Sequence, residues 1–289
     1  MSQSCTICLQ GGTLGNTPER ARVRSNIRRF KDETFTVWRC AACGSLHSLE
    51  EIDFARYYED YPMQRQKLDF FARRLFASRL RELVRGGLSR SHSTLDYGCG
   101  NGNFVKYLLE RGYDGARGFD PYSTTYAERS VLQTAFDCLT SQDVIEHVPD
   151  PKAYLEEIAA LVRRPGGMLA IGTPNADNID LNDPVDRVGQ LHQPHHRHIL
   201  ASRELMRLIE ECGFRIVRVV PRFYVDTWFP FANSVFLFRY MAAVDGTVDA
   251  GFDPIDFGLI LRSPRLLLAG LYGRLMHPRK DILVIAKAI

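Results

Sequence analysis

An acidic residue followed by three alternating glycines is the stretch most suggestive of chemistry. Asp96 ends an apolar segment, and Gly98, Gly100 and Gly102 then lead into a helix-like segment at residues 103–111. Glycines allow sharp backbone turns and let a ligand lie against bare amides. A helix that begins there adds unpaired N–H groups and a positive dipole end. The pattern favours a ligand-binding loop, although a lone Gly-x-Gly also occurs in simple tight turns.

A second acidic residue supports the ligand-binding interpretation. Asp120 lies 22 residues after Gly98, at the end of the apolar segment 116–119, and Pro121 follows it. At this spacing a second strand–helix unit delivers a carboxylate to ribose hydroxyls. The alternative is an acid that caps a following helix. Together, the loop and Asp120 predict a nucleoside cofactor.

The loop sequence distinguishes between cofactors, because an acid two residues before the first glycine disfavours phosphate and suits an ammonium group. In this respect the loop resembles motif I of class I S-adenosylmethionine-dependent methyltransferases. Further segments resemble later motifs of that family in the correct order, at residues 118–120, 136–147, 164–175 and 205–214. The resemblance covers residues 64–223 and the last strand.

The resemblance implies an α/β Rossmann-like fold with a mostly parallel, seven-strand-type sheet, and S-adenosylmethionine as the cofactor. By position, Asp96 and the backbone of the three glycines would hold the methionine end of the cofactor. Asp120, with Pro121 beside it, would bind the ribose. Ser141 and Gln142, at the end of the family's strand four, would flank the methyl group.

Candidate catalytic residues follow strand four. Methyl transfer is an in-line displacement, for which the enzyme supplies alignment and, with a hydroxyl acceptor, a proton sink. Asp143, Glu146 and His147 are spaced to share one side of a helical turn. His147 is the best general-base candidate, because an imidazole accepts a proton near neutral pH. A Glu146–His147 pair that merely holds the loop is the alternative.

Four histidines within seven residues, at positions 192–198, offer a second interpretation of the site. A divalent ion held by Glu146, His147 and one of these histidines would resemble metal-dependent RNA 2′-O-methyltransferases and some quinone O-methyltransferases. Such an ion would acidify a bound hydroxyl. Substrate binding or ordinary hydrogen bonding by these histidines is the alternative.

Four of the seven cysteines form two Cys-x-x-Cys pairs: Cys5 with Cys8, and Cys40 with Cys43. Two such pairs can present four thiolates to one tetrahedral ion, so they predict a structural zinc ribbon. Four unrelated thiols remain the alternative, and His47 is interpreted as a bystander. Cys99, Cys138 and Cys212 occur singly and are expected to be buried small hydrophobic residues.

The predicted organisation is a zinc ribbon at 1–50, a linker at 51–63 and a methyltransferase domain at 64–289 with an apolar insertion at about 224–279. Only 16 residues separate Asp120 from Asp137. Because a parallel crossover alone takes a dozen or more residues, strand three is expected to be a stub at 131–133 after a short helix at 123–130. The adenine contact, which the family places after strand three, is therefore not assigned.

Composition narrows the function without identifying the acceptor. A net charge of +3 is too slight to indicate nucleic-acid binding, and no signal peptide or membrane-spanning run is apparent. A cytoplasmic location is expected. The ribbon together with this methyltransferase core resembles sugar methyltransferases and relatives of the ubiquinone O-methyltransferases, and the resemblance implies methylation of a hydroxyl of a small molecule or sugar. Alternatives are a zinc-ribbon RNA methyltransferase, a lipid or quinone O-methyltransferase at the membrane surface, and a non-catalytic scaffold. The insertion could roof an acceptor pocket, form a homodimer face or touch lipid.

Overall fold

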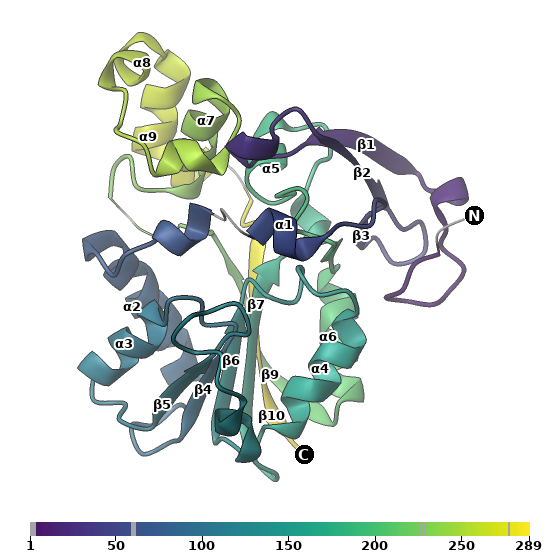
Figure 1. Cartoon of the computed structure of the whole chain (residues 1–289), viewed down its shortest axis with the longest axis vertical. Helices are drawn as coiled ribbons and strands as arrows, with labels where there is room; N and C mark the ends of the chain where they lie inside the picture. Colours follow the sequence, from purple (N-terminus) through teal and green to yellow (C-terminus); the bar gives the residue numbers. More distant parts are fainter. Residues whose placement is uncertain (1–3, 59–61, 226, 228, 277) are drawn as a thin grey trace. The chain divides into compact units, whose positions relative to one another are not determined.

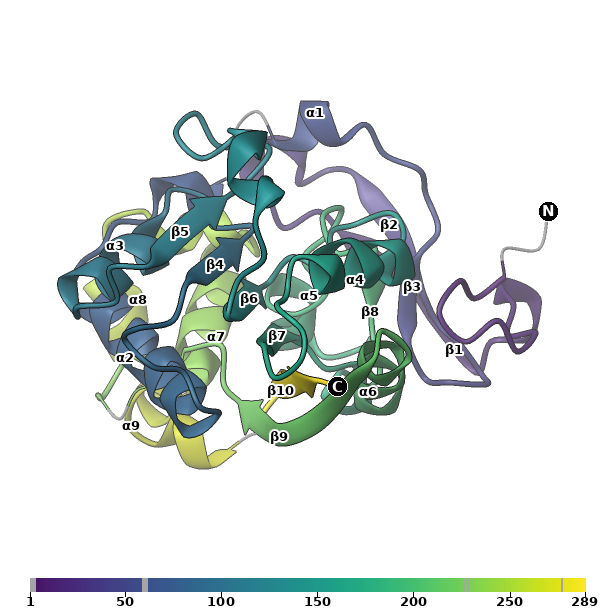
Figure 2. The same cartoon turned by 90° about the horizontal axis from the view of Figure 1, so that it is seen from below.

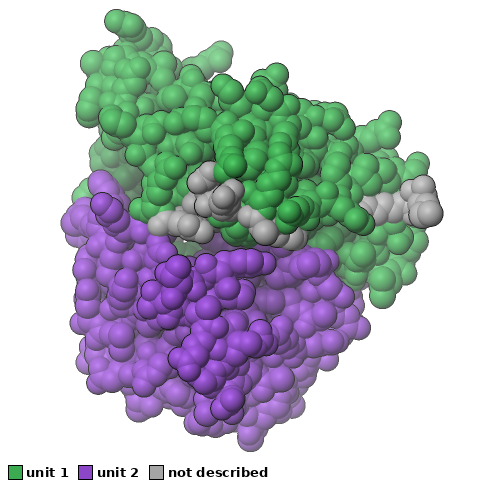
Figure 3. Space-filling view, in the orientation of Figure 1, with its two compact units in different colours: residues 1–65, 175–201, 222–280 green, residues 66–174, 202–221, 281–289 purple. Residues whose placement is uncertain are grey.

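The computed structural model describes residues 4–58, 62–225, 227, 229–276 and 278–289. Part of the predicted linker, at 59–61, lies outside the described residues. The chain forms two compact units, coloured separately in Figure 3. Unit 1 comprises residues 1–65, 175–201 and 222–280, and unit 2 comprises residues 66–174, 202–221 and 281–289.

Unit 2 is built on a six-stranded sheet in the order β5-β4-β6-β7-β10-β9. Strands β5, β4, β6 and β7 are parallel to one another, and β10 is antiparallel to β7. Their bounds are β4 Thr94–Tyr97, β5 Ala116–Phe119, β6 Cys138–Gln142, β7 Met168–Pro174, β9 Phe214–Arg222 and β10 Asp281–Ala288. The predicted Rossmann-like methyltransferase sheet is confirmed, with the last strand inserted beside the strand that precedes it in the chain.

Helices cover both faces of this sheet, as Figures 1 and 2 show. Helices α2 (Phe70–Arg85) and α3 (Asn103–Glu110) lie on one face, and α4 (Pro151–Ala160) and α6 (Ser202–Glu211) on the other. Local chemistry explains two of the starts. The Asp69 carboxylate caps α2 at the Ala72 amide, and Asp150 caps α4 just before a proline at its first position. Both faces being covered, β4 and β7 are buried along their whole length.

The segment between β5 and β6 contains the 3₁₀-helix η4 (Arg129–Gln133) and turns. The predicted strand-three stub at 131–133 is therefore a 3₁₀ turn, and the predicted short helix at 123–130 consists of a turn, irregular backbone and the start of η4. No strand pairs with the outer edge of β5 in the described chain. The shortness of the segment accounts for this, because a further strand needs a full crossover.

Unit 1 contains a four-stranded sheet in the order β1-β2-β3-β8. The strands are β1 Glu19–Arg24, β2 Thr34–Arg39, β3 Leu46–Ser48 and β8 His198–Ile199, and all neighbours are antiparallel. The short helical segments are η1 Leu14–Asn16, η2 Arg28–Phe30, α1 Phe54–Tyr58, η3 Pro62–Arg65, η5 Ala176–Asn178 and α5 Pro184–Val188.

The apolar insertion is helical and belongs to unit 1. Its elements are α7 Ser234–Val244, η6 Val248–Gly251, α8 Phe257–Arg262 and α9 Pro264–Met276. Phe238 and Met241 of α7 share a buried cluster with Ile27, Phe30 and Phe35 of the N-terminal region. The compact unit therefore extends well beyond the predicted ribbon. Among the described residues, no helix combines the length and apolar character needed to cross a bilayer.

Candidate functional site

The glycine loop connects β4 to α3, and its backbone geometry explains its composition. Gly98, Gly100 and Gly102 have φ angles of +79°, +54° and +69°, in the left-handed region that disfavours other residues. A β-carbon at Gly98 would lie 2.2 Å from Val144 Cγ2, whereas one at Gly100 would meet no atom within 4 Å. Gly100 thus presents bare backbone to open space, and Gly102 begins α3.

Asp120 lies at the end of β5 and is bonded to the glycine loop. Its Oδ2 accepts the Gly100 amide at 2.9 Å, and its Oδ1 accepts the Tyr122 amide at 2.8 Å. A carboxylate offers about four acceptor sites, so both oxygens retain capacity for ribose hydroxyls. The structure therefore brings together the two features that the sequence predicted as a pair, and the set fits the methionine and ribose parts of S-adenosylmethionine.

Asp96 is buried beneath the loop and is paired with a cation. Arg79 of α2 donates from Nη2 to Asp96 Oδ1 at 2.9 Å and to Thr140 Oγ1 at 2.7 Å. Its guanidinium also lies 4.0 Å from the ring centre of Phe104. Burial raises the pKa of the Asp96 carboxyl, and the Arg79 charge opposes that effect. Asp96 is only 4% exposed, so it acts within a neutralised pair.

Sequence reasoning missed Arg79, although a signal was present. Ala72, Arg79 and Leu83 are buried on α2, so the arginine interrupts an apolar stripe at helical spacing. A charged residue there requires a buried partner.

Tyr126 was not predicted either, because the segment after Asp120 was left unassigned. Its ring lies close to the glycine loop: a β-carbon at Gly102 would be 2.2 Å from Tyr126 Cε2.

Ser141 and Gln142 end β6, at the same edge of the parallel sheet as the glycine loop. The Ser141 hydroxyl is buried and hydrogen-bonded to the Tyr154 hydroxyl at 2.6 Å. The Gln142 amide is half-buried and donates to Asp143 Oδ1 at 2.8 Å. Of the two, Gln142 has the more accessible side chain.

Residues 143–147 form a turn, rather than the expected helical turn, closed by a hydrogen bond from the His147 amide to the Val144 carbonyl at 2.9 Å. Glu146 is fully buried, and its Oε2 accepts from Thr173 Oγ1 of β7 at 2.9 Å. Burial raises the pKa of Glu146 well above its ordinary value, and the nearby charge of Asp143 adds to that. His147 is half-buried, so it is the more accessible of the predicted pair.

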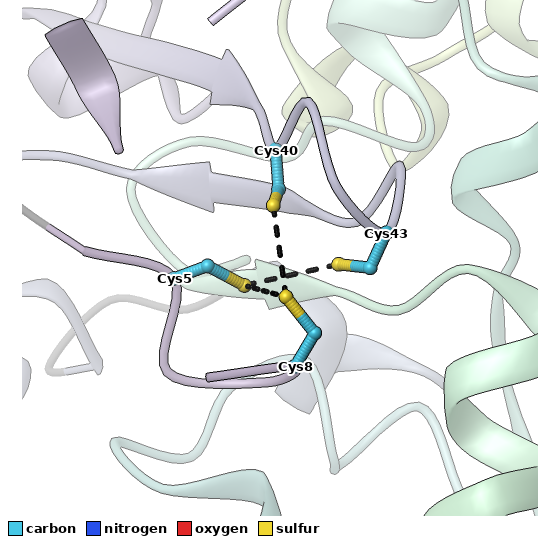
Figure 4. Close-up of side chains that lie close together, drawn as sticks. All are labelled: Cys5, Cys8, Cys40 and Cys43. Carbon is cyan, nitrogen blue, oxygen red and sulfur yellow. Dashed lines mark hydrogen bonds between the residues drawn. The ribbon is translucent and has the colours of Figure 1, made fainter. Parts of the chain in front are cut away.

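The two Cys-x-x-Cys pairs of unit 1 converge, and Figure 4 shows all four sulfurs directed at a common centre. The Sγ atoms of Cys5 and Cys8 are 3.6 Å apart, those of Cys5 and Cys43 are 3.8 Å apart, and those of Cys8 and Cys40 are 3.9 Å apart. A tetrahedral zinc with bonds of about 2.3 Å requires sulfurs about 3.8 Å apart. The donor set therefore fits one zinc ion.

The histidines of the 192–198 segment belong to unit 1, whereas Glu146 and His147 belong to unit 2. Within unit 1, His192 Nδ1 lies 2.7 Å from Asn26 Nδ2, and His198 Nδ1 lies 3.0 Å from His47 Nδ1. Burial lowers the pKa of His195 to about 4 and that of His196 to about 3. The rings of His195 and His196 are therefore neutral at physiological pH. The divalent ion predicted to bind Glu146, His147 and one of these histidines stays a prediction.

The sheet order, the glycine loop and Asp120 define the class: a class I S-adenosylmethionine-dependent methyltransferase with an N-terminal cluster of four cysteines. The methyltransferase domain family matches residues 60–219 of the chain. The chain belongs to that family.

Curated relatives support the assignment to this family. The chain is similar to the ubiquinone biosynthesis O-methyltransferase of Dinoroseobacter shibae, at 31% identity over 179 residues that cover 52% of this chain and 71% of that protein. It also resembles the corresponding enzyme of Aeromonas salmonicida, with 34% identity over 28% of this chain and 42% of that one. An uncharacterized 37.1 kDa transposon protein of Streptomyces fradiae is 35% identical over 30% of this chain and only 26% of its own length.

Solved structures show similar arrangements at low identity. A putative methyltransferase from Haloferax volcanii, in complex with its Trm112 activator, has 15% identity and a TM-score of 0.48, covering 83% of this chain and 99% of that one. The 1,6-didemethyltoxoflavin-N1-methyltransferase of Burkholderia thailandensis has 16% identity and a TM-score of 0.46, covering 88% and 95%.

Proposed function

We propose that the protein transfers the methyl group of S-adenosylmethionine to a hydroxyl oxygen of a small molecule such as a sugar or a phenol. The observation that carries the proposal is the Asp120–Gly100 hydrogen bond, because it holds an intact donor loop at the edge where β6 ends. The relationship to enzymes named as ubiquinone biosynthesis O-methyltransferases supports an oxygen acceptor.

In the proposed reaction, residues of this chain bind the donor, orient the acceptor and accept the proton of its hydroxyl. The glycine amides and Asp120 hold the donor, which supplies an electrophilic methyl group when bound. Gln142 lies beside the site, and His147 takes the proton of the acceptor hydroxyl. Glu146 is buried beneath the same turn, where its bond to Thr173 orients the turn.

The direct test is incubation with isotopically labelled S-adenosylmethionine and a panel of sugars, phenols and metabolite extracts, followed by mass analysis. We expect a product heavier by one labelled methyl group on oxygen. A His147→Ala variant should turn over at least about 100-fold more slowly while binding the donor normally. Full turnover by that variant would remove His147 as the base, and a product methylated on nitrogen or carbon would contradict the acceptor class.

Metal-assisted deprotonation is a second candidate. Glu146 and His147 are neighbours in the turn after β6, and burial raises the pKa of the Glu146 carboxyl well above its ordinary value. A divalent ion held by these two residues would favour the ionised carboxylate and acidify a bound hydroxyl. Activity that disappears with a chelator and returns with Mg²⁺ would favour this candidate, provided that zinc content is unchanged.

For the cysteine cluster we propose a structural zinc ion held by Cys5, Cys8, Cys40 and Cys43. Metal analysis of the purified chain should find about one zinc per chain. A Cys40→Ser variant should lose the zinc and the folded ribbon, whereas Cys212→Ser, outside the cluster, should keep both. Zinc retained in full by Cys40→Ser would contradict the assignment.

An RNA substrate has less support. Among the basic residues of the 20–31 segment, Arg28 is ion-paired with Asp245 and Asp253, and Arg22 lies 3.6 Å from a Glu50 oxygen. These partners neutralise part of the charge that phosphate binding would need.

A further inference from the structure

Helix α9 buries its small residues and exposes most of its large apolar ones. Its inward stripe consists of Leu266, Ala269, Gly270 and Gly273. The helix packs on α7 and α8, and a β-carbon at Gly270 would lie 2.2 Å from the Phe231 ring. The small residues therefore let α9 approach its neighbours closely.

The opposite stripe of α9 is apolar as well, which is unusual for a surface helix. Leu268, Leu271, Tyr272 and Leu275 recur at helical spacing and are 49%, 53%, 54% and 78% exposed. Met276 at the end of the helix is 45% exposed. An exposed apolar stripe of this kind marks an interaction surface.

Helix α8 contributes more apolar surface. Phe257 and Leu261, one turn apart, are 68% and 71% exposed, and Ile255 just before the helix is 55% exposed. We call these residues and the exposed stripe of α9 the α8–α9 apolar face.

The charge carried by α8 and α9 is positive, and the exposed Asp256 between Ile255 and Phe257 is the acid that precedes them. Residues 257–280 contain no Asp or Glu, and their basic residues are Arg262, Arg265, Arg274, Arg279 and Lys280. Arg262 and Arg265 are exposed and form no ion pair with any described residue. The whole chain has a net charge of only +3, so positive charge is concentrated beside the most exposed leucines.

We propose that the α8–α9 apolar face docks on an anionic lipid bilayer. Large apolar side chains flanked by arginines are the pattern of helices that lie in the headgroup layer, and residues 257–280 contain no acid. There the leucines and aromatic rings enter the acyl boundary, and Arg262 and Arg265 contact lipid phosphates. A second copy of the chain would bring these arginines against one another, which disfavours a homodimer through this face. The proposal is independent of the methyl acceptor.

The test is sedimentation of the full chain with vesicles of phosphatidylcholine, with and without phosphatidylglycerol, at low and high salt. We expect partitioning onto the anionic vesicles that weakens in high salt. Leu268→Ser/Leu271→Ser/Leu275→Ser should reduce it at least about tenfold. Arg262→Glu/Arg265→Glu should reduce it at least about tenfold, because each basic residue near the surface contributes about fivefold.

Two control variants distinguish binding through this face from non-specific adsorption of the protein to vesicles. Ile289→Ser removes an apolar side chain that is 76% exposed elsewhere, and Arg215→Glu reverses an exposed charge on β9; both should bind vesicles like the parent. An unchanged helical circular dichroism spectrum and an unchanged thermal unfolding midpoint would show that every variant is folded.

Several outcomes would overturn the proposal. These are absence of vesicle binding, equal binding to neutral and anionic vesicles, and full binding by the leucine variant. A soluble dimer that the leucine variant dissociates, together with no vesicle binding, would assign the face to a second copy instead.

Discussion

At the scale of single residues, the Asp120 carboxylate connects the loop after β4 with the turn after β5. It accepts the Gly100 amide and the Tyr122 amide, so the side chain that we propose as the ribose ligand also orders the glycine loop. Its removal should affect donor binding more than folding, because the side chain is only partly buried.

We therefore expect Asp120→Ala to weaken S-adenosylmethionine binding about 10- to 100-fold, the effect of losing hydrogen bonds to a charged group. Isothermal titration calorimetry measures it directly. Asp114→Ala, which removes an exposed acid before β5, should bind as the parent does. Equal affinities for the Asp120→Ala variant and the parent would show that the ribose is held elsewhere.

Arg79 tests the buried pair beneath the loop. Arg79→Met should leave the Asp96 carboxyl without its cation in a buried site, at a cost of about 3–5 kcal/mol in the free energy of unfolding. Urea denaturation measures that loss. Adding Asp96→Asn to Arg79→Met should restore much of it, because no buried charge is then left unpaired. If the double variant is no more stable than the single one, the pair is not the source of the effect.

At the scale of elements, β3 and β8 join residues far apart in the chain through facing histidines. His47 pairs with His198 across the strands and stacks on Trp38 with ring centres 4.7 Å apart. Burial, with a smaller effect from His198, lowers the pKa of His47 to about 3. The folded state therefore keeps this ring neutral below pH 6.5, where the unfolded chain takes up a proton.

Above about pH 6.5 the neutral His47 ring makes its full contribution to the free energy of unfolding. Below that pH the contribution falls by about 1.4 kcal/mol per pH unit, until about pH 3. A His47→Leu variant should accordingly show a shallower decline in the free energy of unfolding between about pH 6.5 and about pH 4. His92→Asn, which alters a less buried histidine, should decline like the parent. Parallel pH curves for all three proteins would contradict the role of His47.

At the scale of the whole chain, segments distant in sequence share one core. Phe238 of α7 is 6% exposed and belongs to the cluster that contains Ile27, Phe30 and Phe35. The insertion is therefore a structural part of unit 1, whatever its exposed face contacts.

Phe238→Ala should destabilise unit 1 by about 3–5 kcal/mol, the range for truncating a buried aromatic residue. Hydrogen exchange should then rise in β1 and β2, far from position 238 in the sequence, while the α3–β5 region of unit 2 keeps its protection. Phe257→Ala, a truncation at an exposed site, is the control. Exchange changes confined to α7 would mean that the insertion is energetically separate.

Local spacing was enough to predict the donor loop, Asp120 and the four convergent cysteines. Each depends on residues whose types constrain the backbone or the ligand directly: glycines at positive φ, and paired thiols. The shortened segment after β5 was predicted as well, because 16 residues cannot hold a full crossover.

Tertiary structure decided the rest, since those features depend on contacts between residues far apart in the chain. It paired Arg79 with Asp96, joined the N-terminal region and the insertion in one core, and left Leu268, Leu271 and Leu275 of α9 exposed. A pattern of apolar residues at helical spacing indicates that a helix has an apolar face. Which face is buried depends on what packs against it, and in α9 the small residues occupy that side.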